Sequence, residues 1–261
     1  MYRLSTHWFK HMRKIAFTNQ KGGVGKTTTT INTGAGLSKI GYKVLLVDMD
    51  PQANLTYSLK IHSSKMKKNI YHMLKGQSSA KDIIMEHNGF DLLPASIELS
   101  GAEMELVNEP AREQILRSAL KDIEEDYDFI LLDCPPNLGL LTLNAFTAAD
   151  ELVIVLQSEY LALHGLSKLM DLVKIVQQRL NPELKVEGIV CTLFDKRKNL
   201  NREVVGHIRE HFGAKVFDTV IRDNIALAEA PSHHKTIFEY DSQSHGAKDY
   251  LMLAKEIRNG Y

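Results

Sequence analysis

Cysteine is scarce in this sequence, with two residues among 261, Cys134 and Cys191, each inside or beside an apolar run. A disulfide framework or a cysteine metal site needs closely spaced pairs, which these two do not form. We therefore interpret both as buried structural thiols. The adjacent His233 and His234 have no companion ligands at metal spacing, so we interpret them as solvated loop residues.

Long hydrophobic runs and an excess of one charge are also missing. No apolar stretch reaches the roughly 18 residues typical of a membrane helix. Residues 1–14 have no apolar core of a signal peptide. We expect a cytoplasmic protein that does not bind a membrane. Basic and acidic residues number 32 each and the net charge is +0, so any binding to nucleic acid must come from a local patch.

Repeats and a Pro/Gly-rich linker are absent as well, so we expect one domain over residues 1–261, with residues 1–13 as an N-terminal extension. Runs rich in Ile, Val and Leu predict strands at residues 14–18, 43–48, 90–93, 128–133, 151–157 and 186–192. Helical patterns cover residues 27–40, 111–125, 161–180 and 246–258. Residues 54–110 contain shorter, more polar helical pieces, and we expect them to form an insertion at the edge of the sheet. The alternation predicts an α/β fold with a mainly parallel twisted sheet and helices on both faces.

The most informative segment is residues 19–29, Asn-Gln-Lys-Gly-Gly-Val-Gly-Lys-Thr-Thr-Thr, which follows the first strand and opens the first helix. Such a loop lets backbone amides close around phosphate oxygens, while Lys26 brings positive charge to the outer phosphates and the Thr27 hydroxyl can reach Mg²⁺. The helix start adds its positive dipole end. This is a P-loop NTPase pattern. The expected nucleotide contacts in the loop are Lys21, Gly22, Gly23, Val24, Gly25, Lys26, Thr27 and Thr28.

The loop departs from the ordinary G-x-x-x-x-G-K-[ST] pattern, because Gln20 replaces the first glycine and a second lysine, Lys21, stands beside the others. The pattern K-G-G-x-G-K-[ST] resembles the deviant Walker A group, which includes ParA/Soj partition ATPases, MinD-like ATPases, nitrogenase iron proteins and arsenite-pump ATPases. The resemblance implies ATP and Mg²⁺ as cofactors. It also implies that Lys21 reaches across a dimer interface to the nucleotide of the partner subunit. The expected catalytic residues are Lys21, Lys26 and Asp50.

Two strand ends carry carboxylates that match the same group. Residues 46–52 match V-D-x-D-P-Q, and residues 133–136 match D-x-P-P. The resemblance implies that Asp50 positions or activates the attacking water, that Asp48 supports the metal region and that Asp133 holds the water shell of Mg²⁺. The expected metal residues are Thr27, Asp48 and Asp133. The segment 137–146 would respond to the γ-phosphate as a switch.

Within this group the sequence favours the partition type. It has no subunit-bridging cysteines, and residues 246–258 carry an apolar stripe opposite mixed charges where MinD-like proteins have a basic membrane helix. Residues 219–232 resemble the ParA/Soj segment that helps enclose adenine, which implies that Asn224 and Pro231 contact the nucleotide. The resemblance covers about residues 13–258, so we expect the short form without an N-terminal helix-turn-helix domain.

The strongest candidate for DNA binding is the basic run at residues 195–200, which leads into a helical pattern. Arg197 matches a family arginine assigned to DNA contact, although such a run can equally be a solvated helix face. The expected DNA-binding residues are Lys196, Arg197, Lys198, Arg202 and Arg222. Many relatives carry P-R-N-x-R-L where this chain has Asp223 and Ala226 in place of two arginines, so Arg222 would have to compensate.

The resemblance implies an ATPase for chromosome or plasmid partition. ATP would form a homodimer that binds double-stranded DNA without sequence preference, and a ParB-type partner would stimulate hydrolysis on the nucleoid. Two alternatives stay open: an orphan ParA-like ATPase that positions a protein cargo, and an ATP-dependent metabolic ligase of the dethiobiotin or cobyrinate-amidating kind. The ligase needs a second substrate-binding constellation at the strand ends, which the sequence does not reveal.

Overall fold

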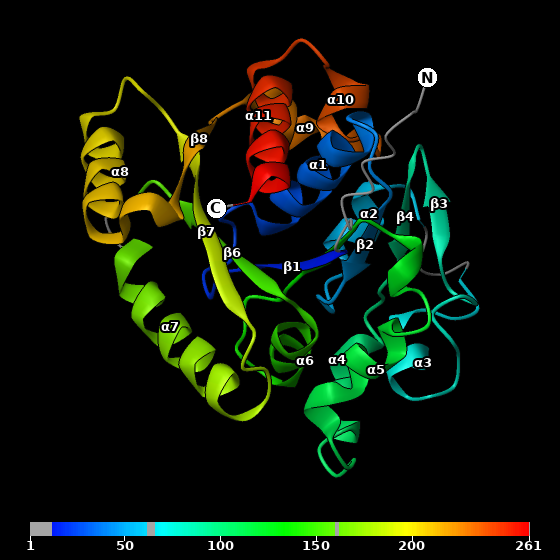
Figure 1. Cartoon of the computed structure of the whole chain (residues 1–261). Helices are drawn as coiled ribbons and strands as arrows, with labels where there is room; N and C mark the ends of the chain where they lie inside the picture. The colour runs from blue at the N-terminus through cyan, green and yellow to red at the C-terminus, as the bar shows by residue number, and fades with distance from the viewer. Residues whose placement is uncertain (1–11, 62–65, 160–161, 261) are drawn as a thin grey trace, which may run out of the picture.

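The computed structural model describes residues 12–61, 66–159 and 162–260. One sheet has the strand order β3-β4-β2-β5-β1-β6-β7-β8 (Figure 1). Its strands are β1 (Arg13–Thr18), β2 (Val44–Asp48), β3 (Met85–His87), β4 (Phe90–Leu93), β5 (Phe129–Asp133), β6 (Glu151–Gln157), β7 (Lys185–Phe194) and β8 (Val216–Arg222). Only the β3–β4 pair is antiparallel among these strands, so the predicted mainly parallel sheet is confirmed.

Helices cover both faces of the sheet. They are α1 (Lys26–Lys39), α2 (Asn54–Ser58), α3 (Ile70–Leu74), α4 (Leu99–Glu105), α5 (Ile115–Leu120), α6 (Leu140–Ala148), α7 (Ala162–Arg179), α8 (Asn199–Phe212), α9 (Ile225–Glu229), α10 (Ile237–Tyr240) and α11 (His245–Asn259). Figure 1 shows α1, α10 and α11 on one side of the sheet and α4 to α7 on the other. Two separate apolar cores match these two layers.

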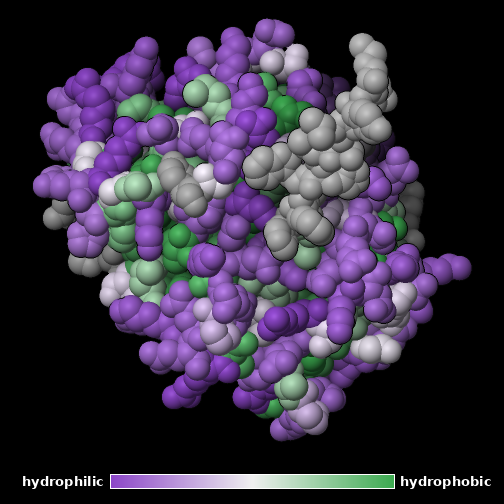
Figure 2. All heavy atoms as spheres, in the orientation of Figure 1, coloured by the Kyte–Doolittle hydropathy of each residue, from purple (hydrophilic) through white to green (hydrophobic). Residues whose placement is uncertain are grey.

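Strand β1 shows why the middle positions of the central strands are apolar on both faces. Ile15 and Phe17 pack in the core beneath α1 and α11, and Ala16 packs in the core of the opposite face. Since successive side chains point to opposite faces, both sets must be apolar when both faces are covered. The surface seen in Figure 2 is mostly hydrophilic, with hydrophobic atoms exposed in small groups.

The strand register brings the predicted functional segments together. In the parallel ladders Asp133 of β5 lies opposite both Asp48 of β2 and Phe17 of β1. The carboxyl ends of β1, β2 and β5 therefore meet at one edge of the sheet, where ligands of open α/β sheets bind. The glycine-rich loop begins at that same edge, directly after β1.

The structure differs from the sequence prediction at three elements. The single helix predicted over residues 111–125 is broken into a 3₁₀ turn at Arg112–Gln114, the short α5 and a second 3₁₀ turn at Glu124–Asp126. The breaks lie at Gln114, with φ −109° and ψ 1°, and at Ile123, with φ −125° and ψ −11°, which are outside the range of an α-helix. Strands β3 and β8 were not predicted. Both lie at the sheet edges, and polar residues interrupt their apolar runs: Glu86 and His87 in β3, and Asp218 and Thr219 in β8.

The remaining boundaries agree with the sequence reading. Helix α1 covers 26–39 against the predicted 27–40, and α7 covers 162–179 against 161–180, with residue 161 outside the described residues. Within residues 54–110, β3 and β4 extend the sheet at one edge. Residues 1–11 of the predicted extension also lie outside the described part.

The packing of α1 against α11 gives a stability prediction. A Cβ added at Gly36 would lie 2.9 Å from the Ala254 Cβ and 3.3 Å from the Tyr250 carbonyl oxygen. We expect Gly36→Ala to lower the free energy of unfolding by about 1–3 kcal/mol, because α11 must move away. Gly206→Ala in α8, where an added Cβ meets nothing within 4 Å, should raise it by about 0.5–1 kcal/mol. Urea unfolding of both variants measures this, and equal effects would contradict it.

Candidate nucleotide-binding site

The glycine-rich loop has the backbone shape of a phosphate cradle. Gly23 and Gly25 have φ values of 74° and 88°, which favour glycine. A Cβ built at Gly22, Gly23 or Gly25 would meet nothing within 4 Å, so the loop surface is open where phosphates would lie. Gly25 is the N-cap of α1 and provides no side-chain cap, which leaves the first helical amides to a ligand.

Neighbouring strands hold the loop in place. The Asn19 side-chain Nδ2 donates to the Val155 carbonyl of β6 at 2.6 Å, and Asn19 Oδ1 accepts from the Lys21 backbone amide at 2.9 Å. The Thr192 hydroxyl at the end of β7 donates to the Val24 carbonyl at 2.7 Å. These contacts attach the loop to β6 and β7, and neither Asn19 nor Thr192 was predicted as part of the site.

The Thr27 hydroxyl donates to Asp133 Oδ2 at 2.7 Å, which joins the start of α1 to the end of β5. Asp133 is fully buried, and burial together with the nearby Asp48 raises its pKa to about 8. Burial also lowers the pKa of Lys26, against the opposing effect of Asp133. A hydroxyl and a buried carboxylate, side by side at the loop, are oxygen donors that suit Mg²⁺, so these residues fit the implied cofactor.

Asp48 and Asp50 are held by the chain that follows β2. Asp48 Oδ2 accepts from the Thr56 amide at 2.9 Å and from the Thr56 hydroxyl at 2.6 Å. Burial raises the pKa of Asp48 to about 6. Asp50 is buried too, and its Oδ1 accepts from the Gln52 amide at 2.9 Å. Asp48 thus supports the turn that carries Asp50, and Thr56 is a residue that the sequence did not reveal.

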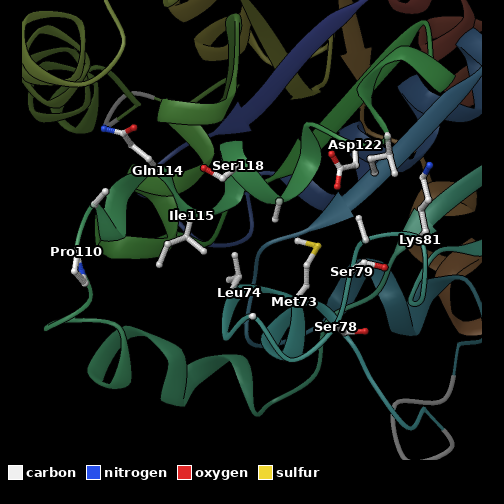
Figure 3. A pocket seen from close by; sticks show the side chains of 15 residues that line it. Met73, Leu74, Ser78, Ser79, Lys81, Pro110, Gln114, Ile115, Ser118 and Asp122 are labelled. Carbon is white, nitrogen blue, oxygen red and sulfur yellow. The ribbon is translucent and has the colours of Figure 1, made fainter.

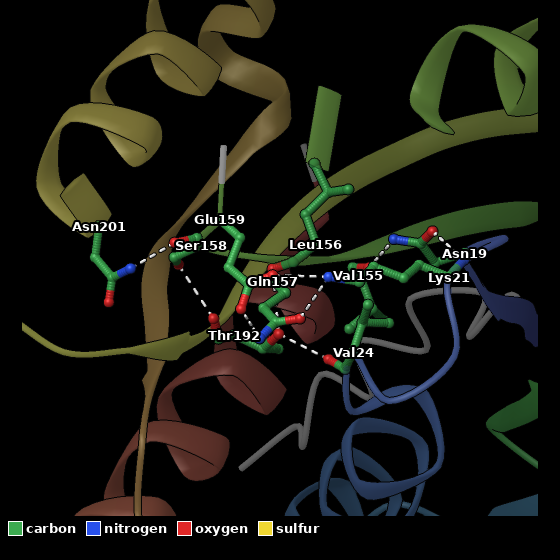
Figure 4. A network of polar contacts seen from close by, with 10 residues as sticks. All are labelled: Asn19, Lys21, Val24, Val155, Leu156, Gln157, Ser158, Glu159, Thr192 and Asn201. Atoms are coloured by element: carbon green, nitrogen blue, oxygen red, sulfur yellow. Dashed lines mark hydrogen bonds and ion pairs between the residues drawn. The ribbon is translucent and has the colours of Figure 1, made fainter. Parts of the chain in front are cut away.

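The Lys21 side chain is half exposed. Its ammonium contacts Glu159 Oε2 at 2.7 Å and Gln157 Oε1 at 3.1 Å, both at the end of β6 (Figure 4). Lys26, by contrast, is buried, and its ammonium donates to the Lys21 carbonyl at 3.3 Å. The two lysines of the motif therefore have different surroundings, one inside the loop and one at the protein surface.

The predicted adenine-side residues lie beyond β8. Asn224 caps α9 by accepting from the Ala226 amide at 2.8 Å, and Pro231 is the second residue of the 3₁₀ turn Ala230–His233 that follows. That turn packs on α2, where His234 Nδ1 lies 3.0 Å from the Tyr57 carbonyl. Since Asp48 and Thr56 position α2, the structure connects this segment to the phosphate side of the site.

The predicted DNA-binding residues divide into two groups. Lys196, Arg197 and Lys198 lie on the exposed loop between β7 and α8, and Arg202 follows on the first turns of α8. The Arg197 side chain is 85% exposed and pairs with Asp195, whose pKa it lowers to about 2. Arg222 instead pairs with the buried Asp249 of α11, with Nη2 2.5 Å from Oδ1. Its charge is therefore partly neutralised within the protein.

A groove of 710 Å³ lies elsewhere, between α3, residues 78–81 and α5 (Figure 3). Its apolar floor includes Met73, Leu74 and Ile115. None of the predicted site residues lines it. Among the described residues, no helix is both long and apolar enough to cross a membrane. In the same part of the chain, no group of three or more His, Cys, Asp or Glu side chains is arranged to hold a metal ion.

Comparison with known proteins places these features in a family. A family model described as an AAA domain matches residues 12–186. The sporulation initiation inhibitor protein Soj of Bacillus subtilis is 49% identical over 245 residues, which cover 93% of this chain and 97% of Soj. The chromosome-partitioning ATPase Soj of Treponema pallidum is 48% identical, with 94% and 96% covered.

The chain belongs to the Soj/ParA family of chromosome-partitioning ATPases. The predicted family is thereby confirmed, as are the ATPase activity and the cofactors ATP and Mg²⁺. A solved structure of cobyrinic acid a,c-diamide synthase from Mycobacterium smegmatis, with an ATP analogue and magnesium, is also similar. It is 36% identical with a TM-score of 0.85, and 95% of each chain is covered.

The buried carboxylate gives a pH prediction. Native Asp133 has a pKa near 8 against 3.8 in the unfolded chain, so the native state binds a proton more tightly than the unfolded state does. Without nucleotide, the free energy of unfolding should fall as pH rises from about 4 to 8. Asp133→Asn should flatten this dependence. The exposed Asp171→Asn is the control, and an unchanged slope in Asp133→Asn, measured by urea unfolding across pH, would contradict the assignment.

Proposed function

We propose that the protein is an ATP-driven switch for DNA segregation, in which ATP forms a homodimer, the dimer binds double-stranded DNA without sequence preference, and a ParB-type partner stimulates hydrolysis. The observation that carries the proposal is the placement of Lys21. Its ammonium lies at the surface on Gln157 and Glu159, while Lys26 occupies the loop. A lysine in that position is available to a second subunit.

The site residues have distinct proposed roles. The amides of residues 22–28 and the Lys26 ammonium hold the phosphates, while Thr27 and Asp133 hold Mg²⁺ through its water shell, with Asp48 in support. Asp50 orients the attacking water, and Asn224 and Pro231 contact the adenine. Bound Mg²⁺ spreads the negative charge that develops on the phosphates during hydrolysis.

DNA binding would use the loop at residues 196–198 together with Arg202. Its affinity should be modest for two structural reasons. Arg222 is paired with Asp249, and the pKa of Arg197 is raised by its hydrogen bond to Asp195 and, to a lesser extent, by the nearby charge of Asp223. The proposed location is the cytoplasm, on the nucleoid, and the proposed partner is a ParB-type protein. An ATP-bound dimer that does not bind DNA would favour the alternative, in which the protein positions a protein cargo.

The Lys26 ammonium gives a test of nucleotide binding. Lys26→Ala should weaken ATP affinity at least tenfold, since a hydrogen bond to a charged group contributes about 1.5–3 kcal/mol. The control is Lys39→Ala in the last turn of α1, which removes the same charge from the far end of the helix. Calorimetric titration with ATP and Mg²⁺ compares the two, and equal affinities would count against the assignment.

The basic loop gives the test of the proposed function. Arg197→Glu should leave ATP binding intact while lowering the affinity of the ATP-bound protein for duplex DNA, and the slope of log K against log salt should fall by about 1. Lys174→Glu, at an exposed position of α7, is the charge-matched control. Fluorescence anisotropy over a salt series measures both. If the two variants bind DNA alike, Arg197 is not part of the patch, and if the unmodified protein never binds DNA, that part of the proposal fails.

A second candidate is supported by the similar synthase structure. A ligase that forms amides would need a site for a carboxylic acid next to ATP. The test is ATP hydrolysis with cobyrinic acid and an ammonia source. Turnover that depends on both substrates would establish the ligase and overturn the switch, while hydrolysis indifferent to them would remove the ligase.

A further inference from the structure

A chain of hydrogen bonds joins the phosphate loop to the basic loop, and Figure 4 shows its buried part from Val24 to Asn201. It begins at Thr192 near the end of β7, whose hydroxyl donates to the Val24 carbonyl at 2.7 Å and lies 3.1 Å from the Leu156 carbonyl. Thr192 is buried, so no water competes for this contact. Because Val24 lies between the loop glycines, any movement of the loop around phosphates changes the contact.

The chain continues from the same residue toward α8. The Thr192 carbonyl accepts from both the amide and the hydroxyl of Ser158, each at 3.1 Å. The Ser158 carbonyl accepts from the Asn201 amide side chain at 2.5 Å. Asn201 Oδ1 in turn accepts from the Asp195 amide at 2.9 Å. Ser158 and Asn201 are both buried.

Asp195 is the first residue of the basic loop and sets the position of Arg197. Its carboxylate accepts from the Arg197 amide at 3.0 Å and from Nε and Nη2 at 3.0 and 2.9 Å. The path from the Val24 carbonyl to the Arg197 guanidinium therefore passes through four side chains and the backbone between them. Each step is a direct hydrogen bond.

Strain lies in the same segment. Leu193, between Thr192 and the basic loop, has a φ of 52°, a conformation that L-residues with large side chains rarely adopt. The register of β7 against β8 is irregular between Cys191 and Phe194. Strained backbone persists only where surrounding contacts enforce it, and it concentrates in segments that switch.

We propose that Thr192 is a positioning residue that couples the phosphate loop to the basic loop at residues 195–198. Phosphates that bind the loop amides shift the Val24 carbonyl, and Thr192, Ser158 and Asn201 pass that shift to Asp195 and Arg197. The consequence for DNA rests on the proposed function, but the coupling itself does not. Coupling is reciprocal, so whatever ATP does to the basic loop, a ligand of that loop does to ATP affinity.

The test is backbone hydrogen exchange with and without saturating ATP and Mg²⁺. In the unmodified protein, ATP should change exchange at residues 21–28 and, by at least about threefold, at residues 193–201. Thr192→Val keeps the shape of the side chain and removes the hydroxyl. In Thr192→Val, the ATP-induced change in hydrogen exchange should persist at residues 21–28 and disappear at residues 193–201. Thr219→Val, which removes a buried β8 hydroxyl that donates to Glu256, should keep both changes.

Asn201→Ala tests the path from the other end, in α8 and outside the glycine-rich loop. It should keep the ATP effect at residues 21–28 and lose it at residues 195–198. If Thr192→Val binds no ATP, the result for Asn201→Ala decides. The proposal is overturned if the unmodified protein shows no change at 193–201, or if Thr192→Val or Asn201→Ala transmits the change in full.

DNA binding separates this proposal from the proposed function. The ratio of DNA affinities with and without ATP should exceed about fivefold in the unmodified protein and fall toward one in Thr192→Val at saturating ATP. If the unmodified protein does not bind DNA in either state, the proposed function fails while the exchange result still decides the coupling. If DNA binding in Thr192→Val keeps its full ATP dependence, the coupling fails while the proposed function stands.

Discussion

The hydrogen bond from Thr27 to the buried Asp133 is the contact on which the site depends. It joins the first turn of α1 to the end of the central strand β5, so the glycine loop between β1 and α1 cannot move without disturbing it. Burial of Asp133 is costly for its charged form, as its raised pKa shows. That cost is offset when a cation binds beside the carboxylate, so the fold itself favours a bound metal and nucleotide.

The remaining parts of the site are arranged around that contact by the strand register. Asp48 lies opposite Asp133 and uses its oxygens to hold Thr56 and the turn with Asp50. Asn19 and Thr192 attach the loop to β6 and β7. The loop is therefore attached to neighbouring strands on one side and open on its ligand side, which is the combination that a binding site for phosphates needs.

The sequence predicted the parallel sheet because the central strands are apolar on both faces, and it predicted the glycine loop because its spacing has a direct chemical meaning. It failed where local pattern and tertiary contact disagree. Residues 111–125 have the apolar spacing of a helix. In the structure, the Asn144 side chain of α6 accepts from the Leu116 amide and donates to the Arg112 carbonyl, and these contacts hold the backbone of residues 112–116 in another conformation. The pairing of Arg222 with Asp249 and the contacts of Thr192 join residues far apart in the chain, and no local signal reports them.

The central claim is that ATP joins two subunits through Lys21. It is tested most directly by light scattering on size-exclusion peaks of Asp50→Ala, in which hydrolysis should stall, with and without ATP and Mg²⁺. The account predicts a monomer without ATP and a dimer with it, and a monomer under both conditions once Lys21→Ala is added to Asp50→Ala. A monomer of Asp50→Ala at saturating ATP, or a dimer indifferent to Lys21, would contradict it.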